Sequence, residues 1–389
     1  MKYSVACCFL THNHPDIVRE ILGRCLKVYA EFDIDICIYD DSDDDATKQV
    51  VDKYLSDGAL NLYYVDIHNA VSGDHKHYML LQGYGLPKDY DYIWPCKDRV
   101  CFEASYVKKI CESIEEGHDV VIGYNENTRW DVGINVMKDV YTDPVEFYRL
   151  YASASTDWEA VIRRRETMLN PIDWKKYEKI YGVGADCNFN QTITLFARLS
   201  EMDTCSVKIC RYSYKERCIS SKGSSGWRNN LFQLWIDKWC SANYLLPSIY
   251  DKYKIEAIKS ETNLVALFGS VDNFIKYKEA GLFNIDVFTK YQDIWEYITE
   301  IPPEYLKMIA NNDYVGAIKA TITDFEACFI SRNYPKAWWI ITSNAFFKNF
   351  YDEDTYQSLM SYSSRYRSDM MEYGVSSVFE GVNSVRDIM

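Results

Sequence analysis

The sequence predicts an α/β fold, a mostly parallel Rossmann-like sheet flanked by helices, followed by an α-helical C-terminal domain. Over the first hundred residues, compact apolar runs with β-branched and aromatic residues alternate with stretches of helical spacing. The connections between them are short, which is typical of strand–helix–strand units in a parallel sheet. From about Asn230 onward, strand patterns give way to long amphipathic stretches rich in Tyr, Trp and Phe.

The individual elements follow in a regular order. The predicted strands comprise residues 3–11, 33–40, 61–68, 89–98, 118–125 and 207–214. The predicted helices comprise residues 14–31, 46–58, 74–86, 105–117 and the second half of 181–202. Pro15 suits a first helical turn and Asn13 is a candidate cap for the same helix. Residues 125–157 show no clear pattern, and we place the domains at 1–244 and 245–389.

The composition excludes several classes of protein. The 389 residues are 48% hydrophobic and 26% charged, and 43 basic against 57 acidic groups give a net charge of −14. Such a chain is a poor candidate for broad binding to nucleic acid, so an anionic ligand needs a local basic pocket. The 13 cysteines include no CxxC pair, which favours buried thiols in a reducing compartment. With no signal peptide or transmembrane span recognised, we expect a cytoplasmic location and leave peripheral membrane attachment open.

Polar segments follow the predicted strands at their carboxyl ends. These segments are THN at 11–13, DDSDDD at 40–45, HNAVSGDHK at 68–76 and KDR at 97–99. In a parallel sheet the carboxyl ends of the strands meet at one edge, where ligands of such folds bind. The sequence therefore predicts a single polar site at this edge.

The aspartate run at 40–45 fits two short patterns poorly. Asp41, Asp43 and Asp45 have the spacing of the first ligands of a calcium loop, but its glycine is absent and a strand precedes it. Residues 43–47 match the D-x-D-x-T of haloacid-dehalogenase-type phosphotransferases, with Asp43 as nucleophile. In that family the nucleophile lies directly at the strand end, whereas this strand ends several residues earlier.

A third match covers residues 3–225, a little over half of the chain. Residues 3–27 and 36–54 resemble the opening of family-two glycosyltransferases, which have the GT-A fold. The resemblance continues at 73–77, at DYIWPCKDR (91–99), at GVGADCNFNQTITLFARL (182–199) and at YSYKERCISS (212–221). It implies that residues 1–244 form a catalytic domain that binds a nucleotide sugar. Residues 245–389 would then bind acceptor, pair subunits or dock on a membrane.

The resemblance implies how the donor nucleotide is held. In that family the carboxylate at the position of Asp40 binds the base or ribose, and a carboxylate suits their N–H and O–H donors. Asp41 shares this role or satisfies the turn, and Thr11 and Asn13 are further nucleotide contacts. Residues 43–45 fall where the next helix begins, and acids there complement the helix dipole and cap free N–H groups.

The resemblance also implies a diphosphate site, but this sequence departs from the family pattern there. Where the family has the metal-binding D-x-D, this chain has Lys97, Asp98 and Arg99. Either Asp98 holds Mn²⁺ or Mg²⁺ together with phosphate oxygens, or cations replace the metal. The cations available for this are Lys97, Arg99, Lys76 and Arg217, which stands where the family often has a histidine. We lean towards weak or absent metal dependence.

The family's general base maps onto Asp186, although the glutamate that precedes it in the family is Ala185 here. Asp186 could alternatively cap the helix that follows. Asp157 and Glu159 are second-choice bases, because Trp158 beside them could stack on a sugar.

Four histidines form the pairs His12-x-His14 and His75-x-His77 on two strand-end loops. We interpret them as polar lining of the pocket, with a zinc site as the alternative.

These expectations combine into an inverting glycosyltransferase. It would move a hexosyl or N-acetylhexosaminyl group from a nucleotide sugar, most simply a UDP-sugar, to a hydroxyl of a glycan, glycolipid or glycoprotein. A homo-oligomer is left open. The alternative is a non-catalytic GT-A-like partner of another glycosyltransferase.

Overall fold

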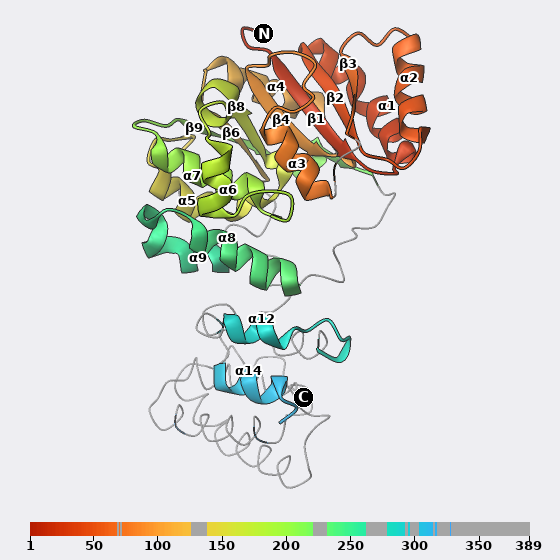
Figure 1. Ribbon diagram of the computed structural model, residues 1–389. Coiled ribbons are helices and arrows are strands. Elements are labelled where there is room, and N and C mark those ends of the chain that lie inside the picture. Colours follow the sequence, from red (N-terminus) through yellow and green to blue (C-terminus); the bar gives the residue numbers. More distant parts are fainter. Residues whose placement is uncertain are drawn as a thin grey trace, which may run out of the picture. The chain divides into compact units, whose positions relative to one another are not determined.

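The computed structural model describes residues 1–67, 70, 72–125, 138–220, 232–261, 278–291, 295, 303–313, 316 and 327. Contacts divide the chain into two units, the first comprising residues 1–229 and 237–262 and the second residues 230–236 and 263–389 (Figure 1). The contacts thus group residues 245–262 with the sheet. The roles expected for the C-terminal part stay predictions.

The first unit is built on a mostly parallel sheet. In spatial order its strands are β3 (Leu62–Asp66), β2 (Ile34–Asp40), β1 (Val5–Thr11), β4 (Tyr92–Lys97), β8 (Val161–Arg164), β6 (Val120–Asn125), β9 (Val207–Tyr212) and β7 (Val140–Tyr141). Strands β3, β2, β1 and β4 run parallel, as do β6 and β9, whereas β8 is antiparallel to both of its neighbours and β7 to β9. A separate antiparallel pair joins β5 (Val100–Phe102) to β10 (Arg217–Ile219).

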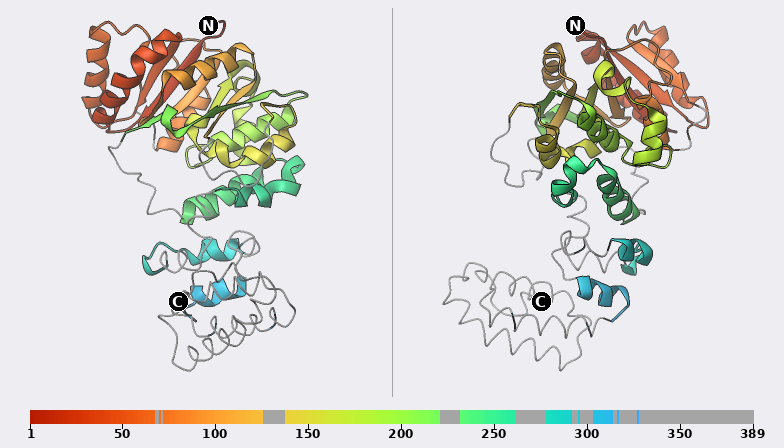
Figure 2. Two further views of the ribbon diagram at one scale, coloured as in Figure 1. Left: turned by 180° about the vertical axis from the view of Figure 1, so that it is seen from behind. Right: turned by 60° about the vertical axis from the view of Figure 1, so that its left-hand side comes forward.

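Helices cover both faces of this sheet (Figure 2). Helices α1 (Pro15–Glu31), α2 (Ala46–Ser56) and α4 (Ala104–Glu115) pack together on one face. On the other face lie α3 (Gly73–Leu81), α5 (Pro144–Tyr151) and α7 (Asn190–Glu201), together with α6 (Trp174–Tyr181), α8 (Trp239–Leu245) and α9 (Lys254–Lys259). Further described elements are short 3-10 segments at Ser153–Thr156 (η1), Trp158–Ala160 (η2), Tyr214–Glu216 (η4) and Ser248–Tyr253 (η7), and π-helical turns at Arg165–Leu169 (η3) and Gln233–Lys238 (η6).

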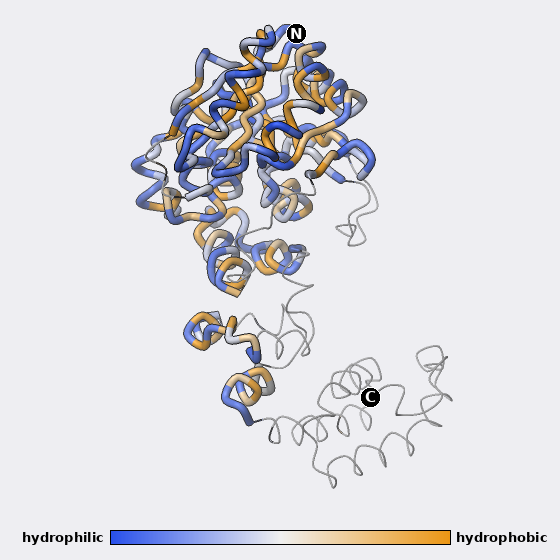
Figure 3. Tube along the Cα trace, turned by 90° about the vertical axis from the view of Figure 1, so that its right-hand side faces the viewer, coloured by the Kyte–Doolittle hydropathy of each residue, from blue (hydrophilic) through white to orange (hydrophobic). Residues whose placement is uncertain are grey.

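Continuous apolar runs explain the central strands. All seven residues of β1 and all seven of β2 are buried, as expected for parallel strands covered on both faces. Helix α1 presents Ile17, Ile21 and Cys25 to the core at helical spacing. At the centre, Tyr29 stacks on Trp94 of β4 with ring centroids 5.9 Å apart. In Figure 3 the helices carry both hydrophobic and hydrophilic colour, as amphipathic helices do.

Two local expectations were wrong or incomplete. The candidate cap of α1, Asn13, makes no capping hydrogen bond, because His14 takes the cap position and Asn13 bonds Asp43 instead. Pro15 does open the helix. Strand β8 was missed, because it is only four residues long and two of them are arginine. It therefore lacks the apolar run that marked the other strands. It nevertheless joins β4 to β6 and so connects the two parallel parts of the sheet.

The second unit contributes α12 (Ile285–Lys290) and α14 (Pro303–Ala310) to the described residues. Phe288 of α12 packs against Trp295 with ring centroids 5.1 Å apart, and Trp295 is fully buried. Most of the predicted helical domain lies outside the described residues. Among the helices that are described, none combines the length and apolar character that a membrane span requires.

Candidate functional site

The strand ends meet as the sequence predicts, and Asp98 lies at their centre. Its carboxylate, directly after β4, accepts a hydrogen bond from the Thr11 hydroxyl at 3.0 Å. Nδ1 of His14 lies 2.7 Å from the same oxygen. Thr11 is the last residue of β1 and pairs in register with Asp40 of β2. Asp98 is buried, and it raises the pKa of the His14 imidazole by accepting its hydrogen bond.

Asp40 is more enclosed than its expected role suggests. It is 1% exposed, one carboxylate oxygen accepts from the Ser42 backbone and hydroxyl, and the other accepts from the Tyr64 hydroxyl at 2.9 Å. A base or ribose could therefore reach Asp40 only if Ser42 or Tyr64 moved.

Asp43, Asp44 and Asp45 do not point towards a common site. Asp43 accepts from the Asn13 side-chain amide at 2.6 Å, and Asp44 accepts from the Ala46 backbone at the start of α2. The capping expectation therefore holds for Asp44, whereas Asp45 makes no capping hydrogen bond. Asp43 links two turns of the strand edge, which accounts for its position without a nucleophilic role.

Lys76 is a structural cation in this structure. It projects from α3, its side chain is 2% exposed, and its ammonium donates to the Thr11 carbonyl and to Asp41. Burial lowers the pKa of Lys76, and Asp41 opposes that shift. His12 lies 3.1 Å from the same oxygen of Asp41. Lys76 thus ties α3 to the ends of β1 and β2.

Lys97 and Arg217 belong to a second charge cluster. The Lys97 ammonium lies 2.7 Å from Asp157 and 3.5 Å from Glu159, and the Arg217 guanidinium donates to Glu159. Glu159 is 1% exposed, whereas Lys97 is 35% and Asp157 30% exposed. Although burial opposes it, the two carboxylates raise the pKa of both cations, and the cations lower the pKa of Asp157.

Four expected site residues are therefore brought together as ion pairs. Asp157 and Glu159, the second-choice bases, neutralise Lys97 and Arg217, two of the four cations expected at the diphosphate. Arg99 lies apart from this cluster. It is half-buried, its backbone carbonyl accepts from Ser220, and its guanidinium makes no hydrogen bond or ion pair within the part of the chain that the structure describes.

Asp186 lies in the loop between α6 and α7. It is exposed, and within the described ranges its carboxylate makes no hydrogen bond or ion pair. Phe189 occupies the cap position of α7, so Asp186 does not cap that helix. An exposed carboxylate without a protein partner is free to accept a proton from a bound hydroxyl.

His77 was expected to line the pocket, but it belongs to a buried polar cluster with Arg163 that sequence reasoning missed. His77 is 2% exposed and packs on Trp158 with ring centroids 4.6 Å apart, and burial lowers its pKa to about 3. Arg163 of β8 is 1% exposed and donates to Thr194 and to the Gln191 backbone, and burial lowers its pKa to about 9. The apolar neighbours of His77 in α3, from Tyr78 to Leu81, were the available signal for its burial.

The described residues do not fit a divalent cation held by the protein alone. Asp98 offers one carboxylate, and its nearest histidine partner, His14, points a ring nitrogen at that carboxylate. In the described ranges, no group of three or more His, Cys, Asp or Glu side chains is placed to hold a metal ion. The zinc alternative gains no support there either, because His77 is fully buried while His75 is only half-buried.

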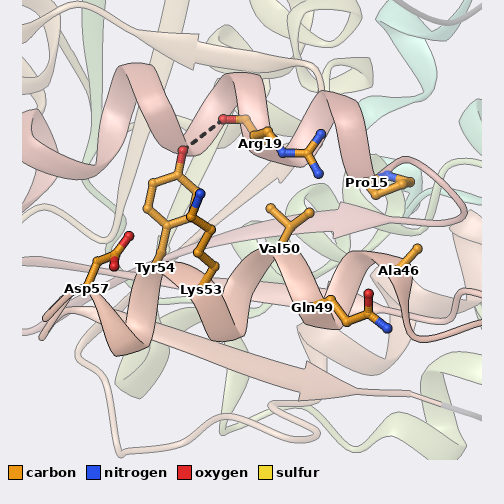
Figure 4. A pocket seen from close by; sticks show the side chains of 8 residues that line it. All are labelled: Pro15, Arg19, Ala46, Gln49, Val50, Lys53, Tyr54 and Asp57. Atoms are coloured by element: carbon orange, nitrogen blue, oxygen red, sulfur yellow. Dashed lines mark hydrogen bonds between the residues drawn. The ribbon is translucent and has the colours of Figure 1, made fainter.

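A cavity of about 360 Å³ lies away from this site, between α1 and α2. Figure 4 shows its lining, where the Tyr54 hydroxyl donates to the Arg19 carbonyl at 3.2 Å. It contains none of the site residues predicted from the sequence.

Comparison with known proteins bears on the fold. No protein-family model and no curated protein matches the chain. The crystal structure of S. aureus TarS 1–349 aligns with a TM-score of 0.50 and 14% identity, covering 80% of this chain and 88% of that one. Its complex with UDP-GlcNAc aligns with the same TM-score and coverages at 13% identity. The mannosyltransferase PcManGT from Pyrobaculum calidifontis, with GDP-Man and Mn²⁺, gives a TM-score of 0.42, 13% identity, and coverages of 80% and 87%.

The chain has the GT-A glycosyltransferase fold. This matches the fold class predicted from the sequence, a mostly parallel sheet with flanking helices. At these identities the similarity concerns the fold alone. Within this fold, Asp98 lies at the carboxyl edge of the parallel strands β1, β2 and β4.

Proposed function

We propose that the protein is an inverting glycosyltransferase that moves a sugar from a UDP-sugar to an acceptor hydroxyl, with Asp186 as general base. The observation that carries this proposal is the placement of Asp98. It lies at the carboxyl end of β4, is held by Thr11 and His14, and stands at the ligand-binding edge of a GT-A fold. The choice of UDP is supported by the similar fold of TarS 1–349, which was crystallised with UDP-GlcNAc and with UDP.

In this proposal the side chains divide the work. Asp186 accepts the proton of the acceptor hydroxyl as that oxygen attacks the anomeric carbon, and the nucleoside diphosphate departs from the opposite face. Lys97 and Arg217 stabilise the charge that develops on the diphosphate. Because Asp157 is 30% exposed, it is the carboxylate that an entering phosphate can displace, whereas fully buried Glu159 keeps the two cations together.

Release of free nucleotide from a panel of UDP- and GDP-sugars, each with Mn²⁺ and with a chelator, tests this function. We expect turnover of one donor, which is lost in Asp186→Asn, and we expect UDP to bind that variant and the control as tightly as the wild type. The control is Asp203→Asn, an exposed carboxylate on the loop before β9, at the opposite edge of the sheet. Full turnover by Asp186→Asn would overturn its role as base.

The chelator arm addresses the metal. Turnover that survives the chelator supports stabilisation by Lys97 and Arg217 alone. Turnover that the chelator abolishes means that a cation joins Asp98, with ligands from the diphosphate or from outside the described residues.

A second candidate is a non-catalytic GT-A-like partner of another glycosyltransferase. The ion pairing of Lys97 and Arg217 favours it, because two cations already neutralised by Asp157 and Glu159 need no diphosphate. Silence across the donor panel together with no measurable binding of UDP would favour this role over catalysis.

A further inference from the structure

The loop that carries Asp186 is attached to the first turn of α3. The side-chain amide of Asn188 donates to the Asp74 carboxylate at 2.6 Å. The Ser72 hydroxyl, which also caps α3 by accepting from the His75 backbone, lies 3.4 Å from the Ala185 carbonyl. Asp74 and Ser72, at the start of α3, therefore contact Asn188 and Ala185, which flank Asp186 in the loop.

A single buried amide shapes the inner side of the same loop. Asn190 is 1% exposed, and its NH₂ group donates to the carbonyls of Gly184 and Cys187 at 2.8 Å each. Its oxygen accepts from the Gly184 backbone at 2.8 Å. Gly184 has a φ of +145°, which glycine adopts readily and other residues do not. The loop is thus a fixed turn. Its shortest hydrogen bond to the start of α3 is Asn188 to the Asp74 carboxylate, beside the longer contacts of Ser72 with the Ala185 carbonyl and of Asn190 with the Asp74 carbonyl at 3.5 Å.

We propose that Asp74 is a positioning residue that holds the Asp186 loop on α3 and thereby sets where the Asp186 carboxylate stands. The inference rests on the proposed function only for the role of Asp186. The attachment itself rests on contacts that are independent of any reaction. Asp74 would contact neither the sugar donor nor the sugar acceptor, and it acts through Asn188.

The environment of Asp74 makes this attachment depend on pH. Burial raises the pKa of Asp74 to about 6, although the Asn188 hydrogen bond and the charge of Lys238 act in the opposite direction. Among the described residues, the Cys187 thiol also faces it. A hydrogen bond to an ionised carboxylate is about twice as strong as one to a neutral acceptor. The attachment is therefore strongest above this pKa and weakens as the carboxyl becomes protonated.

Hydrogen exchange of the peptide that spans residues 183–190, followed by mass spectrometry, measures the attachment directly. Asp74→Ala should speed exchange in this peptide by about tenfold, since a charge-assisted hydrogen bond is lost. Asp74→Asn should give a rate between those of wild type and Asp74→Ala, because the new amide oxygen still accepts from Asn188 but carries no charge. Asn188→Ala removes the same bond from the loop side and decides the matter if Asp74→Ala does not fold. Glu146→Ala, another acid in a first helical turn, should change nothing in this peptide.

Nucleotide release measured on the same variants links the loop to the reaction. Asp74→Ala should lower kcat about tenfold with UDP binding retained. Asp74→Asn should lower kcat less, and it should lose the contribution of Asp74 protonation to the decline in rate below about pH 6. Unchanged exchange in both Asp74→Ala and Asn188→Ala would overturn the attachment. Faster exchange with unchanged kcat would overturn the positioning role. Absence of turnover in the wild-type protein would count against the proposed function, and the exchange rates would still decide for or against the attachment.

Discussion

Two lysines stand at the same edge of the sheet, and their surroundings give them opposite properties. The side chain of Lys76 is 2% exposed, and burial lowers its pKa even though Asp41 accepts from its ammonium. The side chain of Lys97 is 35% exposed, and Asp157 and Glu159 outweigh the effect of burial and raise its pKa. One lysine is enclosed with a single carboxylate, and the other shares two carboxylates near solvent.

The exposure of the two lysines and of their partners decides which of them can bind a ligand. Removing the partner of a buried charge is costly, so Lys76 cannot exchange Asp41 for a phosphate without leaving that carboxylate with His12 as its remaining described partner. Lys97 can exchange, because Asp157 is 30% exposed and can turn to water. A basic residue at a strand end is therefore a candidate phosphate ligand only when its protein partner can be solvated.

The largest effect is expected at Glu159, which joins Lys97 to Arg217. Glu159→Ala leaves the Arg217 guanidinium, 18% exposed, without its ion-pair partner and leaves Lys97 with Asp157 alone. Breaking such a buried pair costs about 3–5 kcal/mol of unfolding free energy. Chemical denaturation followed by fluorescence measures it. The matched control is Glu166→Ala, whose carboxylate is 78% exposed and pairs with Arg164, with an expected cost below about 1 kcal/mol. Equal costs for the two variants would show that the cluster is solvated and would remove the contrast between the lysines.

A similar cost is expected on the other side of the comparison. Lys76→Met keeps the length of the side chain but leaves Asp41 with His12 as its remaining described partner, at a cost of about 3 kcal/mol. The same denaturation experiment on Lys48→Met, an exposed lysine paired with Asp52, should give a much smaller cost, because solvent screens this pair. A cost for Lys76→Met that is no larger than this would mean that Lys76 is not needed to join α3 to the sheet.

The sequence was sufficient for the half of the fold where pattern and burial agree. Strands β1, β2 and β4 are continuous apolar runs, and their polar ends could be placed at one edge from the order of strands and helices alone. Strand β8 could not be found in this way, because its arginines are balanced by tertiary contacts. Arg163, for example, is buried against Thr194 and Gln191 of α7.

The position of the strand-end residues at one edge could be predicted, but their pairing could not. Asp98, Thr11, Lys76 and Lys97 do stand at the predicted edge. Which carboxylate neutralises which cation depends on segments far apart in the chain, such as Lys97 with Asp157. Sequence spacing carries no information on such pairing, and it also contained no sign that Asp74 and Asn188 meet.

Binding of UDP should also differ between variants of the two lysines. Lys97→Met should weaken UDP binding about tenfold, which corresponds to about 1.4 kcal/mol, because one charge-assisted hydrogen bond to phosphate is lost. Lys76→Met should change the affinity less at a temperature where both variants are folded. Isothermal titration calorimetry measures both, and Lys97→Arg serves as the control that keeps the charge. Equal losses in the two methionine variants would assign Lys76 to the diphosphate as well.

The smallest effect concerns His14, whose partner Asp98 follows Lys97 in the chain and accepts a hydrogen bond from Thr11. Its hydrogen bond to Asp98 raises the pKa of His14 above the ordinary value of 6.5. A raised pKa in the folded state means that protonated His14 stabilises the protein fully below about pH 6.5, and that this stabilisation is lost as the pH rises through the folded-state pKa. The difference in unfolding free energy between wild type and His14→Gln should therefore shrink with rising pH. It should do so by less than about 1 kcal/mol, because the ring is 35% exposed and its charge is screened. Added salt should reduce the difference at low pH. A difference that grew with pH would mean that His14 is neutral when it bonds Asp98. The positive charge at this edge would then come from Lys97 and Lys76 rather than from His14.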